Sequence, residues 1–161
     1  VEAALASAAR PVIVVTGNAA DKTKAALRDL DVTFVDNPDF ANGLSTSLKA
    51  GIAAVPQGCD GALVILGDMP GVSPALIDKL IASFDPSEGR AICVATRKGK
   101  YGNPVLWARR FFPEIIAIEG DVGAKSLMGV YDELVCEVEA GDDAPLIDID
   151  TPEALAAYRA R

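Results

Sequence analysis

The sequence predicts a three-layer α/β domain with a mostly parallel sheet. Short apolar runs that stop at glycine or aspartate alternate with segments whose apolar residues recur at helical spacing. The connections between them are short, and half of the 161 residues are apolar. A chain of this length can bury a sizeable core, so we expect residues 1–161 to form one domain.

The first half of the chain predicts a βαβ unit followed by an interior strand. The expected elements are a helix end over 1–9, a strand over 11–17, a helix over 18–30, a strand over 32–35, a helix from 45 to about 55 and a strand over 62–66. The short links around the first helix force its two flanking strands to run parallel. The apolar run 62–66 is typical of a strand covered on both faces in the middle of a sheet.

The second half continues the alternation of strands and helices. The expected elements are a helix after Ser73 and Pro74 that buries Leu76, Ile77, Leu80 and Ile81, a strand over 90–96, a basic turn into 105–107, a helix over 109–118, a helix that opens near 119–125 and runs through Met128, a more exposed strand over 134–138 and a last helix after Thr151 and Pro152. We find no repeat, linker or internal domain boundary.

Composition excludes several function classes. Fifteen Lys and Arg against 23 Asp and Glu give a formal charge of −8, which repels nucleic acid and anionic membranes. The chain has no histidine, which excludes histidine zinc sites, Ser-His-Asp hydrolysis and imidazole acid–base catalysis. The three cysteines lack paired spacing, and we interpret Cys93 and Cys136 as core residues. No apolar run approaches the roughly 20 residues that span a bilayer and no signal is recognisable, so we expect a cytoplasmic protein.

Asp68 is the first candidate functional residue. It follows the apolar run 62–66 and Gly67, and ligands of open α/β sheets gather at the carboxyl ends of such strands. A carboxylate placed there can meet a metal ion or a ribose. The alternative is a carboxylate that only accepts hydrogen bonds from loop amides, and we favour the ligand because no helix start is close enough for Asp68 to cap.

Further candidates lie in the loop before the helix at 45. Gly43 lets the backbone approach a flat ligand closely. The hydroxyls of residues 45–47 lie beside the free amides of the predicted helix start, which suits an anion. Ser45 could equally be the N-cap of that helix and nothing more.

Other polar residues leave two interpretations open. Asn103 lies between a glycine and a proline, which constrain its backbone and leave its amide free to read a ligand edge. Asp121 could be a helix N-cap or a second carboxylate that faces a metal. The basic run 97–100 could contact a ligand or form a solvated face. Asp148 and Asp150 are explained by capping of the last helix.

Five short motifs follow one another along most of the chain. They are Asn37-Pro38 through Gly43-Leu44-Ser45-Thr46-Ser47-Leu48, then Leu66-Gly67-Asp68-Met69-Pro70, Gly102-Asn103-Pro104, Gly120-Asp121-Val122-Gly123-Ala124-Lys125 and Asp148-Ile149-Asp150-Thr151-Pro152-Glu153. In this order they resemble the molybdopterin nucleotidyltransferases of the NTP-transferase group, and most closely the molybdenum cofactor cytidylyltransferase branch.

The resemblance implies a Rossmann-like nucleotidyltransferase fold and an activity. That activity is the Mg²⁺-dependent transfer of CMP or GMP from CTP or GTP to the phosphate of a molybdopterin-type acceptor, with release of pyrophosphate, in molybdenum cofactor biosynthesis. It implies that Asp68 and Asp121 are catalytic and hold the metal. The residues implied in nucleotide or substrate binding are Gly43, Leu44, Ser45, Thr46, Ser47, Asn103 and Lys125. Such a transfer needs a metal and charge neutralisation but no histidine and no covalent nucleophile, in agreement with the composition.

The sequence also departs from that family. Its members begin with a strand and a glycine-rich loop, Leu-Ala-Ala-Gly-x-Ser-x-Arg-Met-Gly, that wraps the triphosphate, whereas this sequence starts after that loop. We therefore expect a sheet without its first strand, with two strand edges left open, and weak binding of triphosphate by these residues alone. We expect either that the sequence is a fragment of a longer protein or that a neighbouring chain supplies the strand. The domain could be fused to or paired with another cofactor-synthesis domain.

Two alternative functions stay open at this point. One is a non-catalytic nucleotide- or pterin-binding module that keeps the fold without the triphosphate loop. The other is a nucleotidyltransferase that acts on a different phosphorylated acceptor, such as a sugar phosphate, because these folds serve many substrates.

Overall fold

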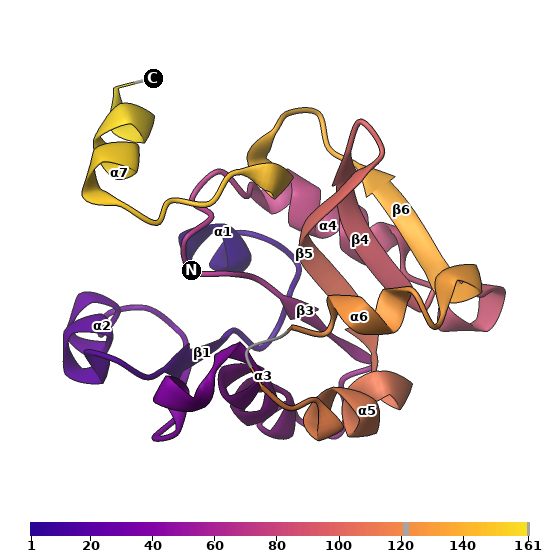
Figure 1. The fold of residues 1–161 in the computed structure, drawn as a ribbon, viewed down its shortest axis with the longest axis horizontal. Helices are drawn as coiled ribbons and strands as arrows, with labels where there is room; N and C mark the ends of the chain where they lie inside the picture. The colour runs from indigo at the N-terminus through magenta and orange to yellow at the C-terminus, as the bar shows by residue number, and fades with distance from the viewer. Residues whose placement is uncertain (121–122, 161) are drawn as a thin grey trace.

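The computed structural model describes residues 1–120 and 123–160. In chain order the elements are α1 (Glu2–Leu5), β1 (Ile13–Thr16), α2 (Ala20–Ala26), β2 (Thr33–Asp36), η1 (Phe40–Asn42), α3 (Leu44–Ala53), β3 (Gly61–Val64), α4 (Pro74–Ser83), η2 (Pro86–Glu88), β4 (Ile92–Arg97), β5 (Lys100–Ala108), η3 (Arg109–Phe111), α5 (Phe112–Ala117), α6 (Lys125–Met128), η4 (Asp132–Leu134), β6 (Val135–Glu139), η5 (Ala144–Leu146) and α7 (Pro152–Arg159). Figure 1 shows their arrangement.

The strands form two sheets. The larger sheet has the order β3–β5–β4–β6, in which β5 is antiparallel to both neighbours and β4 is parallel to β6. Three of its strands, β3, β4 and β6, therefore point the same way and β5 runs against them. β1 and β2 form a separate parallel pair connected through α2, as the predicted βαβ unit requires. The predicted α/β class is confirmed.

β3 is the element that differs most from its prediction. The sequence predicts an interior strand, but the structure places β3 at the edge of the larger sheet, antiparallel to β5, with all four residues half-buried. Among the described residues β1 likewise pairs with β2 alone. An apolar run indicates covered faces, but it does not report how many strands lie beside it.

The core is organised around β4, whose side chains alternate between two clusters. Ile92 and Val94 pack with residues of α3, α5 and α6, while Cys93 and Ala95 pack against α4. All four are fully buried. Figure 1 shows α4 on one side of the larger sheet and α5 and α6 on the other. This is the predicted three-layer arrangement, and the interpretation of Cys93 as a core residue is confirmed.

α4 and α7 each begin directly after a residue whose side chain caps the helix. Ser73 Oγ accepts a hydrogen bond from the Leu76 amide at 3.2 Å, and Thr151 Oγ1 accepts one from the Ala154 amide at 3.1 Å. α2 is shorter than predicted and buries none of its residues. In the described part of the chain we find no helix long and apolar enough to cross a bilayer.

Candidate active site

The loop between β2 and α3 is held by Asn37, a buried residue with 4% of its surface exposed. Its Nδ2 donates hydrogen bonds to Thr46 Oγ1 and Ser47 Oγ, both at 2.9 Å. Its Oδ1 accepts one from the Asp39 amide at 3.0 Å, and its own amide donates to the Thr16 carbonyl at 2.7 Å. A single residue thus ties the end of the β1–β2 pair, through its backbone amide, to the start of α3, through its side chain.

Asn37 was not singled out as a site residue by the sequence, although a signal was present. An asparagine directly after a strand and before Pro38 can satisfy several backbone and side-chain groups of a loop at once. Its contacts show that Thr46 and Ser47, predicted to bind substrate, also hold the loop together. The Thr46 hydroxyl in addition lies 2.9 Å from the Gly43 carbonyl and 3.1 Å from the Asp39 carbonyl.

α3 begins after Gly43, and this corrects the alternative in which Ser45 is the N-cap. Gly43 is the N-cap residue and has φ 109°, in the region that favours glycine. Ser45 is the second residue of the helix and is 2% exposed. A glycine, and not a capping hydroxyl of Ser45, therefore precedes the first turn of the helix.

A shallow, open pocket lies over this loop. It has a volume of about 610 Å³, and its lining residues are Phe40, Ala41, Asn42, Gly43, Leu44 and Ser47. Three of the predicted substrate-binding residues, Gly43, Leu44 and Ser47, are thus brought together at one surface.

Asp68 lies four residues beyond the end of β3, in the loop before α4. Among the side-chain nitrogen and oxygen atoms of the described residues, its Oδ1 is the one buried atom without a hydrogen-bond partner. Loop amides therefore do not satisfy this oxygen, which speaks against a merely structural carboxylate. The Asp68 carbonyl accepts a hydrogen bond from the Ile149 amide at 2.8 Å.

Asn103 of β5 lies toward the end of the larger sheet at which β3 stops and the Asp68 loop begins. Val64 of β3 is level with Val105 of β5, and these strands are antiparallel. Residues of β5 before Val105 therefore extend past the end of β3, on the side of the sheet where the Asp68 loop begins. Asp68 and Asn103 therefore belong to the end of the sheet at which the sequence predicts the site.

Two further predicted residues, Asp121 and Lys125, belong to the segment that leads into α6. Asp121, predicted as a metal ligand, lies outside the described residues. The backbone after it reaches α3, because a Cβ atom on Gly123 would lie 3.6 Å from Leu44 Cδ2. Lys125 opens α6 with an exposed side chain, and partial desolvation of its ammonium lowers its pKa. A phosphate beside it would offset that desolvation.

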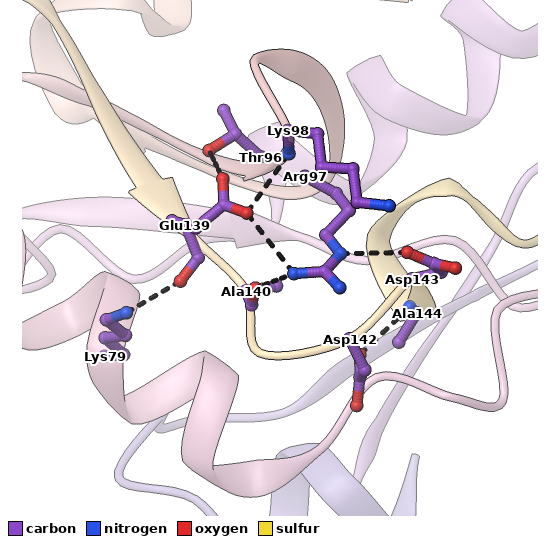
Figure 2. A network of polar contacts seen from close by, with 9 residues as sticks. All are labelled: Lys79, Thr96, Arg97, Lys98, Glu139, Ala140, Asp142, Asp143 and Ala144. Carbon is purple, nitrogen blue, oxygen red and sulfur yellow. Dashed lines mark hydrogen bonds and ion pairs between the residues drawn. The ribbon is translucent and has the colours of Figure 1, made fainter.

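The basic run 97–100 contains a residue that serves the fold. Figure 2 shows the Arg97 guanidinium between Asp143 and Glu139, with Nε 2.8 Å from Asp143 Oδ1 and an Nη1 hydrogen bond to the Ala140 carbonyl at 3.2 Å. These carboxylates raise the pKa of Arg97, with Asp143 as the main cause. The Arg97 side chain therefore ties β4 to the segment after β6 and is not free to meet a ligand.

The segment before α7 also reaches the candidate site. Thr151 caps α7, so the expectation that Asp148 and Asp150 are explained by capping is wrong. Both are exposed, and they flank Ile149, whose amide binds the Asp68 carbonyl. Sequence spacing could not reveal this proximity, because about 80 residues separate the two segments.

Comparison with known proteins supplies the family. The model of the MobA-like NTP transferase domain matches residues 1–135, most of the chain. The chain belongs to the MobA-like NTP transferase family. The purine catabolism protein PucB of Bacillus subtilis (strain 168) is 31% identical over 75% of this chain and 58% of its own length. The molybdenum cofactor cytidylyltransferase of Escherichia coli (strain K12) is 26% identical over 81% of this chain and 64% of its own length. The chain thus spans about three fifths of the length of these two relatives.

A solved structure extends the similarity to almost the whole chain. Rv0371c from Mycobacterium tuberculosis H37Rv, in complex with manganese, superposes with a TM-score of 0.79 at 26% identity, over 99% of this chain and 83% of that one. The resemblance of this MobA-like NTP transferase domain to the molybdopterin nucleotidyltransferases is confirmed at the level of the family.

The residues of this MobA-like domain fit a divalent cation at Asp68. In the described part of the chain no group of three or more Asp, Glu or Cys side chains forms a preformed metal cage. Mg²⁺ does not require one, since it is commonly bound by one or two carboxylates together with substrate phosphates. The unpartnered buried Oδ1 of Asp68 is an acceptor of this kind.

Proposed function

We propose that this chain is the catalytic domain of a nucleotidyltransferase that uses Mg²⁺, binds CTP or GTP, and transfers the nucleoside monophosphate to the phosphate of a molybdopterin-type acceptor. The observation that carries the proposal is the buried Asp68 Oδ1 without a protein partner at the end of the sheet. Membership of the MobA-like family and similarity to a molybdenum cofactor cytidylyltransferase support it.

The roles of the described residues follow from their positions, and that of Asp121 follows from the family resemblance. Asp68, together with Asp121, would hold the metal, which neutralises charge on the phosphates when bound. The Gly43 backbone, which carries no side chain, can approach the nucleotide closely, and the Lys125 ammonium offers a charge to its phosphates. The Asn103 amide, on β5, can form hydrogen bonds with the nucleotide or with the acceptor.

No general base is needed in this proposal. The attacking group is a phosphate oxygen that is already anionic at neutral pH, so positioning and charge neutralisation carry the reaction. This agrees with a chain that contains no histidine. The net charge of −8 means that the phosphates must be held by local groups rather than by a general positive field.

The decisive experiment is a titration of the full-length protein with CTP and GTP, with and without Mg²⁺. We expect Asp68→Ala to keep its melting temperature and to lose the metal-dependent part of the affinity, by about tenfold or more. The matched control is Asp60→Ala, which changes an exposed aspartate directly before β3, at the opposite end of the strand from Asp68. Unfolding of Asp68→Ala, or an unchanged dependence on Mg²⁺, would contradict the proposal.

Pyrophosphate release then tests the acceptor. Release from CTP or GTP with a molybdopterin-type phosphate supports the proposed reaction. Release with a sugar phosphate but not with a molybdopterin-type phosphate would show that the enzyme acts on a different phosphorylated acceptor. Tight nucleotide binding by the full-length protein without release, with any acceptor, would favour the binding module.

A further inference from the structure

Phe40 differs from the phenylalanines of the core. It is 43% exposed and lines the pocket over the η1–α3 loop, whereas Phe111 and Phe112 are buried beside α5. A single exposed aromatic residue is common on protein surfaces and needs no explanation by itself. Phe40 is different because its position is fixed although its ring lies open.

The base of the Phe40 side chain rests on Gly17. A Cβ atom at Gly17 would lie 2.5 Å from Phe40 Cβ and 2.9 Å from Phe40 Cγ, so this contact requires glycine. The backbone on either side is also fixed, because Asn37 binds the Asp39 amide at 3.0 Å and the Asp39 carbonyl accepts the Asn42 amide at 2.8 Å. An aromatic ring held in this way is a preorganised surface for a flat ligand.

The pocket suits an uncharged, flat group. None of its six lining residues carries a charge, so the anionic part of a nucleotide gains nothing there. Its apolar surface comes from Phe40 and Leu44, while Asn42 and Gly43 add polar groups that can meet the edge of a base. A volume of about 610 Å³ is within the range of small-molecule sites and accommodates a base with its ribose.

We infer that Phe40 is the platform on which the base of the bound nucleoside triphosphate stacks, with its phosphates directed away from the pocket. The inference rests on the proposed function and adds a substrate-binding residue to it. Stacking is available to every base, so Phe40 contributes affinity for both CTP and GTP, and discrimination between them is left to polar groups such as Asn42.

The test measures affinities of the full-length protein for CTP, GTP and inorganic tripolyphosphate, all with Mg²⁺. Phe40→Leu keeps an apolar side chain on Gly17 but removes the ring, and we expect it to weaken both nucleotides by about 5- to 100-fold while tripolyphosphate binding is unchanged. Phe40→Trp restores nucleotide affinity. Tyr101→Leu, which removes a similarly exposed ring from β5, is the matched control and leaves all three affinities unchanged.

The outcomes separate this inference from the proposed function. If wild-type protein binds nucleotides with Mg²⁺ and Phe40→Leu binds them equally well, only the stacking platform is overturned. Equal losses for tripolyphosphate and the nucleotides would overturn it too, since they indicate a general disturbance of the site. If the wild-type protein binds none of the three ligands, the proposed function fails and this inference fails with it.

Discussion

The β4–β5 hairpin and the β1–β2 pair are built from similar apolar runs but are buried to different degrees. β4 has a strand on each side and helices on both faces, and its residues from Ile92 to Thr96 are buried. β1 has one partner strand, and three of its four residues are only half-buried. The number of neighbouring strands, rather than the composition of the run, decides how deeply each strand is buried.

The two regions contribute differently to this domain, because one supplies much of the core and the other leads into the candidate site. The hairpin supplies several of the large fully buried side chains, including Trp107, which packs edge-on against Phe111 with ring centroids 6.0 Å apart. The β1–β2 pair supplies little core, but it leads into Asn37 and the pocket-lining loop. In the proposed function the polar loops carry most of the binding residues, with Asn103 of β5 as an exception, and the hairpin mainly provides the scaffold.

The largest expected effect tests this contrast directly. We expect Trp107→Ala to lower the free energy of unfolding by about 3–5 kcal/mol, because it empties a fully buried site. Val14→Ala in β1 should cost only about 1 kcal/mol, since its side chain is half-exposed. Urea denaturation of both variants measures the difference. Equal losses would mean that β1 is as much part of the core as β5.

A second, smaller effect sharpens the role of the β1–β2 end. Asn37→Ala removes three side-chain hydrogen bonds from a buried position, and we expect a loss of roughly 1–3 kcal/mol. Nucleotide affinity should fall as well, because the loop that carries Phe40 loses its anchor. Asn18→Ala, at an exposed asparagine, serves as the control and should change neither quantity. Reduced stability with unchanged affinity would separate the loop from the site.

The smallest effect concerns the ion pairs that Arg97 of β4 makes with Glu139 of β6 and with Asp143. The Lys98 amide, Thr96 and Arg97 lower the pKa of Glu139, and Arg97 lowers that of Asp143. Carboxylates with lowered pKa stabilise the fold above their ordinary values of 4.5 and 3.8, and this stabilisation is lost as the pH falls through the folded-state values.

We therefore expect Arg97→Gln to be less stable than wild type at pH 7. The gap should narrow as the pH falls below about 4, where the partner carboxylates become protonated. Thermal unfolding across that range measures it. Arg28→Gln disrupts an exposed pair with Asp29 and should show no such narrowing. A gap that stays constant with pH would mean that Arg97 acts through packing alone.

Much of the fold could be predicted from the sequence because it depends on local patterns. The βαβ unit, the buried face of α4 and the caps at Ser73 and Thr151 follow from apolar spacing and from capping side chains. The edge position of β3 could not be predicted from its composition, because neighbours in a sheet are set by long-range pairing.

The candidate site was predicted in part for the same reason. Asp68 follows the end of a strand and Gly43 precedes a helix, where sequence signals are strong, while Asn103 lies within β5 and is marked by its neighbours Gly102 and Pro104. The contribution of Asn37 depends on the three groups that converge on it, and the approach of Asp148 and Asp150 depends on a contact across the chain. Neither is visible in any window of neighbouring residues.

The hydrogen bond from the Ile149 amide to the Asp68 carbonyl has a practical consequence. The match to the family model stops at residue 135, and an expression clone trimmed there would discard β6 together with this bond. Such a clone would still carry Asp68, Gly43 and Asn103, yet the loop around Asp68 would have lost its brace from the far end of the chain. A lack of activity in such a shortened protein could therefore result from the truncation and would not disprove the proposed function.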